Sequence, residues 1–270
     1  MAEAAGAAVI LSPGSTGVLP DAHAQNMHVG GSKGSISGNF AMAEADLLIV
    51  VGSRAVCQAD CSGIGYKRAH AVININGDLA DALHYNKTVA LVGDIGAVAG
   101  RLADKLEALK ANGNKGPWLK ACAAKKAEWS AYKQKRYACG PLRDEAWQKP
   151  VLTQPAAIKL VADFAKEIGA AKFFDAGDVQ ANGFQIVEDE RTGDTFTEAG
   201  ASYMGFAASA LLGAALAEKP RYGIAFCGDG SFMMNPQILV DAVEHRVRGM
   251  IVIFDNRRMA AITGLQMAQY

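Results

Sequence analysis

Apolar runs rich in Val and Ile recur along the first 110 residues, and each of them closes on a glycine. They read DLLIVVG, AVINING and TVALVG, at residues 46–52, 71–77 and 88–93. Runs without regular polar alternation are typical of strands that are buried on both faces. Residues 95–111, IGAVAGRLADKLEALKA, instead predict a helix. Strands that alternate with helices indicate parallel βαβ units and an open α/β sheet.

Strand and helix patterns alternate again in the last 120 residues. The predicted elements are an amphipathic helix (151–169), a strand with its loop (171–180), a helix of small residues (201–220), a strand (221–227), a crossover helix (231–249) and a strand (250–256). This order predicts a second parallel sheet with helices around it. The fold class expected for the whole chain is therefore α/β, with two doubly wound parallel-sheet domains.

The stretch between these two regions has a different texture. It is basic, contains all three tryptophans of the chain and carries Gly-Pro at two places. We interpret residues 111–150 as a partly helical connector that its aromatic side chains anchor. The expected domains are thus 1–110 and 151–270, on either side of the connector.

Composition narrows the range of functions. Half of the residues are apolar and the formal net charge is zero, which argues against a nucleic-acid-binding surface. No stretch reaches the roughly 20 apolar residues of a membrane span, and no secretory signal is recognisable. Five cysteines without such a signal fit a reducing cytoplasm. Cys57 and Cys61 lack a second ligand pair at a suitable spacing, so buried thiols are a better interpretation than a metal site.

Gly228-Asp229-Gly230 closes the apolar run 221–227, and Asn256 closes the next strand. Gly-Asp-Gly could be a bare turn, and two strand-end polar residues could be unrelated. However, carboxyl ends of parallel strands meet at the edge where open α/β sheets bind ligands. The two glycines let a backbone approach a ligand, and a helix N-terminus attracts anions. Carboxylate and amide oxygens suit Mg²⁺, so the pattern indicates a magnesium diphosphate site.

The segment from Gly228 to Asn256 closely resembles the thiamine diphosphate motif, in which Gly-Asp-Gly precedes Asn-Asn by about two dozen residues. Here the 24 residues 231–254 lie between the two parts, and Asp255 replaces the first Asn. The resemblance implies that Asp229, Asn256 and the main-chain carbonyl of Arg258 bind Mg²⁺. It also implies that Gly228, Gly230 and Ser231 contact the cofactor.

A second segment, GASYMGFAASALLGA, resembles the part of acetolactate-synthase-like enzymes that carries a large apolar residue before Gly-Phe. The resemblance implies that Met204 wedges under the cofactor and that the carbonyl of Ser202 accepts from its pyrimidine amine. Taken alone, Met204 would be expected in a core, because Met commonly fills gaps there.

The first half resembles the central domain of the same superfamily, through GGSKGSISGNFAMAEADLLIVVGSRAV and AVININGD. In some members this domain holds FAD, which would lie near Arg54 and the segment Asn74 to Asp78; a domain without nucleotide is the alternative. CQADCSG, DALHYN and DNRRMAAITGLQMAQY are most similar to the branch that hydrolyses cyclic 1,2-diones. In that branch His28 and His84 would touch substrate, although a single His is more often a packed residue.

The resemblance implies an enzyme that uses thiamine diphosphate and Mg²⁺ to cleave a C–C bond next to a carbonyl, with hydrolysis of a cyclic 1,2-dione as the first candidate. An acetolactate synthase type of carboligase or decarboxylase, acting on 2-oxo acids, is the second. A non-catalytic nucleotide-binding module is a third, but GGSKGSISG misses the Gly-x-Gly-x-x-Gly spacing.

The family's activating glutamate lies on a pyrimidine-binding domain, usually of a neighbouring subunit in a homo-oligomer. No segment of this chain resembles that domain, so we expect no catalytic residue here. Residues 2–12 look like an interior helix and strand, and the chain stops soon after the Asn256 strand. We therefore expect both domains to be incomplete: the chain would be part of a longer polypeptide or one subunit of a split enzyme.

Overall fold

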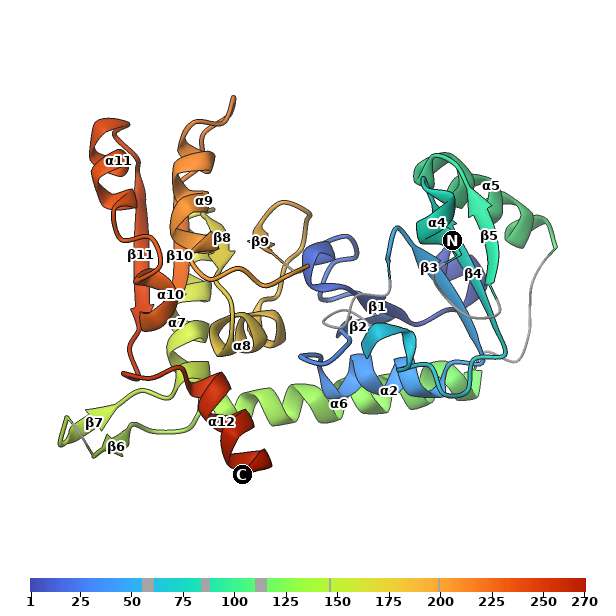
Figure 1. Cartoon of the computed structure of the whole chain (residues 1–270). Helices are drawn as coiled ribbons and strands as arrows, with labels where there is room; N and C mark the ends of the chain where they lie inside the picture. The colour runs from blue at the N-terminus through green and yellow to red at the C-terminus, as the bar shows by residue number, and fades with distance from the viewer. Residues whose placement is uncertain (55–60, 84–87, 110–115, 146, 199) are drawn as a thin grey trace. The chain divides into compact units, whose positions relative to one another are not determined.

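The structure is a computed structural model, and it describes residues 1–54, 61–83, 88–109, 116–145, 147–198 and 200–270 (Figure 1). The chain divides into two compact units. Unit 1 consists of Met1–Ser15 and Leu19–Ala131, and unit 2 of Thr16–Val18 and Tyr132–Tyr270. The division along the chain falls within one helix, α6 (Gly116–Tyr137), which occupies much of the predicted connector.

Unit 1 contains the three strands that the apolar runs predicted. They are β3 (Leu47–Val51), β4 (Ala71–Asn76) and β5 (Thr88–Val92), and they form a parallel sheet in that order. Two helices follow strands β4 and β5, α4 (Leu79–Ala82) and α5 (Ile95–Ala108). The side chains of Asp78 and Asp94 cap them by accepting from backbone N–H groups of the first turn.

The remainder of unit 1 is built around a second, two-stranded parallel sheet of β1 (Val9–Leu11) and β2 (Asn26–Val29). Its short elements are α1 (Ala2–Ala5), η1 (Pro13–Ser15), α2 (Ile36–Glu44) and η2 (Cys61–Gly63). Met27, Ala41 and Cys122 form a buried cluster at this sheet, beside the stacked rings of Phe40 and Trp118. Burial raises the pKa of the Cys122 thiol to about 11, so this cysteine is a packed residue.

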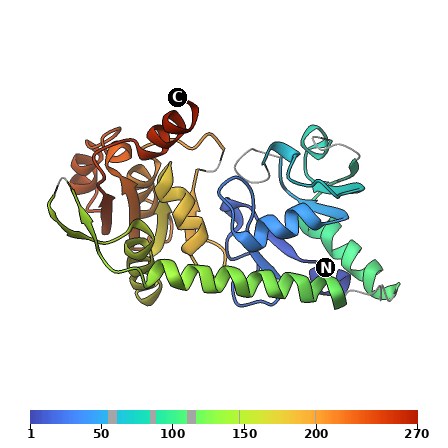
Figure 2. The ribbon, with the colours of Figure 1, turned by 90° about the horizontal axis from the view of Figure 1, so that it is seen from below.

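Unit 2 contains a four-stranded parallel sheet in the order β11-β10-β8-β9 (Figures 1 and 2). Its strands are β8 (Ala171–Phe174), β9 (Thr195–Thr197), β10 (Gly223–Gly228) and β11 (Gly249–Phe254). An antiparallel hairpin, β6 (Leu142–Asp144) and β7 (Lys149–Val151), precedes the sheet in the chain.

Helices cover both faces of this sheet. On one face, the stacked rings of Phe174 and Phe226 have their centroids 4.3 Å apart. Both side chains pack with α7 (Gln154–Glu167) and α8 (Asp178–Ile186). On the other face, Phe173 and Cys227 pack with α9 (Phe206–Ala215) and α11 (Ile238–Glu244). Neighbouring residues of one strand thus point to opposite cores. The expected parallel α/β architecture is confirmed, and unit 2 is wound on both faces.

Two predicted helices differ from the structure. The segment 201–220 is helical only from Phe206 to Ala215, because residues 201–205 form a loop with Ser202 and Gly205 at positive φ. The crossover segment 231–249 is not one helix: a short helix, α10 (Asp229–Phe232), ends near its start, and α11 follows. Pro236 lies between them, and it lacks the N–H that a continuous helix requires. The last element of the chain is α12 (Ala260–Gln269).

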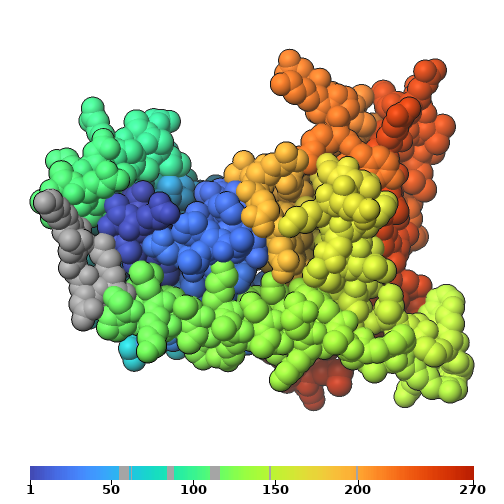
Figure 3. Space-filling view, turned by 180° about the vertical axis from the view of Figure 1, so that it is seen from behind, coloured from blue at the N-terminus to red at the C-terminus, as the bar shows by residue number. Residues whose placement is uncertain are grey.

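Several large apolar side chains of unit 2 are exposed on α11 and α12. They are Leu239, Val240, Val243, Ile262, Leu265 and Met267. Figure 3 shows α11, in orange-red, projecting at the margin of the unit. Among the described helices, none combines the length and the apolar character that a membrane crossing requires.

Candidate functional site

The strand order of unit 2 fixes where a ligand can enter. From β8 the chain passes to β9 on one side of the sheet, and it then returns to form β10 on the other side of β8. The order therefore reverses between β8 and β10, and ligands of open α/β sheets bind outside the carboxyl ends of strands at such a point. Asp175 directly follows β8 and Asp229 directly follows the last paired residues of β10.

Asp229 and Asn256 lie at neighbouring strand ends, as the sequence predicted. Strands β10 and β11 pair in parallel up to Gly228 and Phe254. Asp229 is half-buried, and its Oδ1 accepts from the N–H of Gly230 at 2.8 Å. Asn256 is exposed, and its Oδ1 accepts from the N–H of Arg258 at 3.1 Å. The register thus brings the Gly-Asp-Gly turn and the Asn256 loop to one edge of the sheet.

Three groups at this edge have oxygens that could hold a metal: the carboxylate of Asp229, the side-chain amide of Asn256 and the main-chain carbonyl of Arg258. The carbonyl of Arg258 accepts from the N–H of Ala260 at 3.0 Å. A carbonyl, amide or carboxylate oxygen has more than one lone pair, so each of the three candidate groups retains capacity for a cation. A β-carbon built on Gly228 would meet no described heavy atom within 4 Å, which leaves open space beside the turn. The residues present therefore fit a Mg²⁺ ion bridged to a diphosphate.

Asp255, the residue that departs from the Asn-Asn pattern, closes a local turn. Its Oδ1 accepts from the N–H of Arg257 at 2.9 Å. The side-chain oxygen of an asparagine could make the same turn. The acceptor that closes this turn is therefore one that asparagine would also supply.

Met204 lies against the Gly-Asp-Gly turn. Its Cε is 3.6 Å from the position that a β-carbon would occupy on Gly230, and Cε of Met259 is also 3.6 Å from that position. The Met204 side chain is 39% exposed, so it does not belong to the core of the unit. Ser202, two residues earlier, has a φ of +61°, which a non-glycine residue rarely adopts. The structure thus brings together Met204 and Gly230, which the resemblance assigned to one site.

One carboxylate that the sequence analysis missed organises the loop of Met204. Glu198 accepts from the backbone N–H groups of Gly200 at 2.7 Å, Ala201 at 3.1 Å and Tyr203 at 3.2 Å, and also from that of Ser202. Partial burial alone would raise the pKa of Glu198, but these backbone hydrogen bonds outweigh it and lower the pKa below its usual 4.5. The ionised carboxylate therefore holds four successive amides in a nest.

Gln180 fixes the same loop through its side-chain amide. The side chain is buried on α8, and its Nε2 donates to Thr197 Oγ1 at 2.7 Å and to the carbonyl of Glu198 at 2.9 Å. Its Oε1 accepts from the Ser202 hydroxyl at 3.1 Å. A buried amide with this many partners has one orientation, so the Ser202 position is set by the sheet and α8.

Asp175 holds the beginning of α9. This fully buried carboxylate accepts from the N–H of Gly205 at 2.9 Å and of Ala207 at 3.0 Å. Burial, and then the charge of Asp175 nearby, raise the pKa of the Cys227 thiol well above its ordinary value. The hydrogen bonds of Asp175 to Gly205 and Ala207 tie the strand end at the switch point to the helix that follows Met204. The sequence signal for Asp175 was the one used for Asp229, an acidic residue directly after an apolar strand.

The residues expected near a flavin lie at the carboxyl ends of two neighbouring strands of unit 1. Arg54 is exposed after β3. Asn74 and Asn76 are buried on β4, and their Nδ2 atoms donate to the carbonyls of Asp81 at 3.3 Å and Ser53 at 3.4 Å. Asp78 caps α4. These bonds define the local turns, and binding of FAD stays a prediction.

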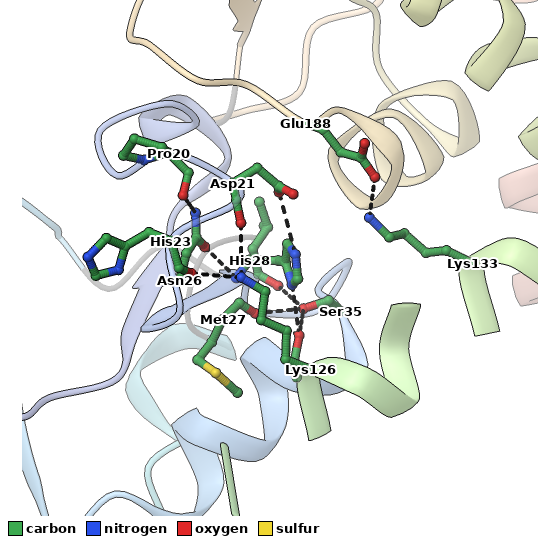
Figure 4. Close-up of polar contacts among 12 residues, drawn as sticks. Pro20, Asp21, His23, Asn26, Met27, His28, Ser35, Lys126, Lys133 and Glu188 are labelled. Carbon is green, nitrogen blue, oxygen red and sulfur yellow. Dashed lines mark hydrogen bonds and ion pairs between the residues drawn. The ribbon is translucent and has the colours of Figure 1, made fainter. Parts of the chain in front are cut away.

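His28 belongs to a buried polar network in unit 1 (Figure 4). Its side chain is about nine-tenths buried, its Nδ1 lies 3.0 Å from Ser37 Oγ, and its Nε2 lies 3.4 Å from Asp21 Oδ1. The Ser37 hydroxyl in turn donates to the carbonyl of Met27 at 2.8 Å. These contacts give His28 a packing role between β2, α2 and the segment before β2. His84 and Cys57 lie outside the described residues.

Helix α6 carries two lysine contacts, which Figure 4 shows. Within unit 1, Lys126 Nζ donates to the carbonyls of Asp21 at 2.9 Å and His23 at 2.8 Å. Within unit 2, the buried Lys133 Nζ donates to Glu188 at 2.8 Å. Both contacts are structural and lie outside the Gly-Asp-Gly edge.

Two protein-family models match the chain. The model for "Thiamine pyrophosphate enzyme, central domain" matches residues 1–102. The model for "Thiamine pyrophosphate enzyme, C-terminal TPP binding domain" matches residues 175–270. The second match begins at Asp175 and contains all of the residues proposed for the cofactor and metal, from Ser202 to Arg258.

Two groups of similar proteins bear on the function of this chain. The large subunit of acetolactate synthase isozyme 1 from Escherichia coli (strain K12) is 28% identical over 247 residues, which are 91% of this chain and 41% of that protein. The 3D-(3,5/4)-trihydroxycyclohexane-1,2-dione hydrolase of Lacticaseibacillus casei is 44% identical over 72 residues, 27% of this chain and 11% of the hydrolase. The hydrolase of the same name from Clostridium tetani is 26% identical over 264 residues, 88% and 39% of the two chains.

The chain spans about two fifths of the length of the relatives in the two longer matches. Both groups of relatives therefore contain segments that have no counterpart in these 270 residues.

Proposed function

Because the chain belongs to the thiamine pyrophosphate enzyme family, we propose that it forms the diphosphate- and magnesium-binding part of an enzyme that cleaves a C–C bond next to a carbonyl. The observation that carries this proposal is the β10–β11 register, which brings Asp229 and Asn256 to the same sheet edge. The position of Met204 over Gly230 supports it independently.

In this proposal each residue of the site has a separate task. Asp229, the side-chain oxygen of Asn256 and the carbonyl of Arg258 hold Mg²⁺, and the metal compensates the diphosphate charge. Gly228, Gly230 and Ser231 line the turn where the diphosphate approaches the backbone. Met204 and the Ser202 carbonyl fix the shape and orientation of the cofactor. When bound, thiamine diphosphate supplies a nucleophilic carbon and an electron sink for the cleavage of the bond.

For the reaction, we propose hydrolysis of a cyclic 1,2-dione. The support is the 44% identity to the Lacticaseibacillus casei hydrolase, which is the higher identity although it covers 72 residues. Joining or decarboxylating 2-oxo acids is the second candidate, because the similarity to acetolactate synthase extends over 91% of the chain. Product analysis of the complete enzyme with cyclohexane-1,2-dione and with pyruvate separates them: ring-opened acid from the dione supports hydrolysis, whereas acetolactate from pyruvate supports carboligation.

The catalytic assembly in this proposal includes a pyrimidine-binding domain, from the same or another chain, that supplies the activating glutamate. Each of the helices α11 and α12 exposes three large apolar side chains, which favours such a partner, because soluble proteins rarely expose large apolar residues side by side. In a homo-oligomer, the pyrimidine-binding domain of one subunit would contact the diphosphate-binding domain of another.

Whether FAD binds at Arg54 and Asn74 to Asp78 is tested by adding the flavin to the purified protein and measuring the quenching of its fluorescence.

Calorimetric titration with thiamine diphosphate, with and without Mg²⁺, tests the proposed cofactor site. The proposal predicts binding that requires the metal, because the diphosphate charge is compensated mainly through it. Equal affinity without Mg²⁺, in the presence of a chelator, would contradict the roles of Asp229 and Asn256.

A further inference from the structure

The exposed hairpin β6–β7 contacts the loop that carries two of the proposed metal ligands. Arg257 lies in the chain between Asn256 and Arg258, and its Nη2 is 2.8 and 2.9 Å from the two carboxylate oxygens of Asp144. Its guanidinium also lies 5.3 Å from the ring centre of Trp147. Figures 1 and 2 show the hairpin beside the loop that follows β11.

Asp144 links this contact to the fold of the hairpin itself. It is the last residue of β6, it pairs with Lys149 of β7, and its Oδ1 accepts from the N–H of Trp147 at 2.7 Å. Lys149 Nζ lies 4.6 Å from the centre of the Trp147 ring, so the indole contacts two cations. A hydrogen bond that closes the turn and an ion pair thus share one carboxylate.

The backbone of Arg257 needs external support. Its φ is +57°, a conformation that costs a non-glycine residue free energy and persists where the surroundings enforce it. Its N–H donates to Asp255, and the next N–H, of Arg258, donates to Asn256. These two turns set the direction of the Asn256 side chain and of the Arg258 carbonyl. Anchoring the Arg257 side chain therefore fixes the groups on both sides of it.

We propose that the β6–β7 hairpin positions the metal-binding loop, with Asp144 and Trp147 as positioning residues that act through Arg257. The inference rests on the proposed Mg²⁺ site. It adds a function to a segment that lies, along the chain, between α6 and the four-stranded sheet of unit 2. The hairpin holds the Asn256 oxygen and the Arg258 carbonyl in place before the cation binds. Less binding free energy is then lost in ordering the loop.

The positive charge of Arg257 allows its role as an anchor to be separated from its electrostatic effect on the cation. Arg257→Gln removes a positive charge close to a cation site, so electrostatics alone would tighten Mg²⁺ binding. Loss of the anchor would weaken it, roughly threefold for an exposed ion pair of this kind. Arg143→Gln is the matched control: it removes the same charge from the same hairpin, where Arg143 Nη2 contacts Gln148 at 2.6 Å rather than the loop. Mg²⁺ affinity is measured by calorimetry at saturating thiamine diphosphate.

Weaker Mg²⁺ binding by Arg257→Gln and by Asp144→Asn, with Arg143→Gln equal to the wild type or tighter, supports the proposal. Wild-type or tighter binding by Arg257→Gln overturns it. Asp229→Ala is measured alongside: if it too keeps the wild-type affinity, the metal site itself is wrong, whereas loss in this variant alone rejects only the role of the hairpin.

Hydrogen exchange without cofactor gives a second readout. Arg257→Gln and Asp144→Asn should speed amide exchange at Arg257 and Arg258, whereas Arg143→Gln should not. Unchanged exchange at both amides would overturn the proposal whether or not the chain binds the cofactor.

Discussion

The methyl carbon of Met204 lies 3.6 Å from the point where a β-carbon would stand on Gly230. This contact joins the loop before α9 to the turn after β10, two segments that leave the sheet on either side of its switch point. Asp175 fixes the start of α9, and Glu198 fixes the loop itself. Met204 therefore sits at the switch point because two carboxylates hold the backbone around it.

Met204→Ala should lower turnover of the complete enzyme more than it lowers cofactor affinity. The diphosphate anchor supplies most of the binding, whereas the side chain acts on cofactor shape, and misplacement of a reacting group costs about 10- to 100-fold in rate. Turnover at saturating cofactor and calorimetric affinity are compared, with Met233→Ala as an exposed control of the same type. A collapse of affinity with unchanged turnover would make Met204 an ordinary packing residue.

Glu198→Gln should loosen the loop of Met204 and remove part of its pH dependence. The folded protein lowers the pKa of Glu198 below its usual 4.5, so the stabilisation is fully present above that value and is lost as the pH falls through the lower, folded pKa. Amide exchange at residues 200–203 of the wild type, measured over a pH range on both sides of 4.5 and corrected for its intrinsic pH dependence, should lose its protection only below 4.5.

The variant should show low protection at these amides throughout this range. Burial alone would raise the pKa of Asp194, but its contacts with Arg221 and Arg191 outweigh this effect and lower the pKa. Asp194 is present in both proteins, so its titration cancels in the comparison. Identical protection profiles of the variant and the wild type would show that the four hydrogen bonds to Glu198 do not order the loop.

Asp175→Ala should destabilise unit 2 by about 3 kcal/mol, because the change leaves buried N–H groups at the start of α9 without their acceptor. Asp175→Asn should cost less, since one side-chain oxygen remains. Urea unfolding measures both, and Asp163→Ala is the control, because that carboxylate pairs with Lys159 on the exposed surface of α7. Equal stability of Asp175→Ala and Asp163→Ala would refute the structural role of Asp175.

The strands and the ligand-binding edge could be predicted from the sequence because both depend on local patterns. Apolar runs mark strands, and the residue after each run must lie at the carboxyl edge. Asp229 and Asn256 were found in this way. Asp175 carried the same signal, and the strand order that makes it central is visible only in the fold. The expected burial on both faces is wrong for β3 and β5, because Leu47, Val51, Val89 and Val92 are exposed there.

The features that the sequence did not reveal depend on contacts between distant residues. Glu198 captures amides that the pattern of 201–220 would place in a helix, so the helix begins at Phe206 instead. The break at Pro236 was readable from the chemistry of proline, and the predicted crossover helix ignored it. The contact of Asp144 with Arg257 joins residues 113 positions apart, which no local pattern encodes.

The central claim is that Asp229 anchors a Mg²⁺-bound diphosphate, and calorimetry of Asp229→Ala with thiamine diphosphate and Mg²⁺ tests it most directly. Asp241→Ala, an exposed carboxylate of α11, is the control for the loss of one negative charge. We predict that Asp229→Ala loses Mg²⁺-dependent binding of thiamine diphosphate while Asp241→Ala keeps it. Unchanged, metal-dependent affinity in Asp229→Ala would contradict the assignment of the site.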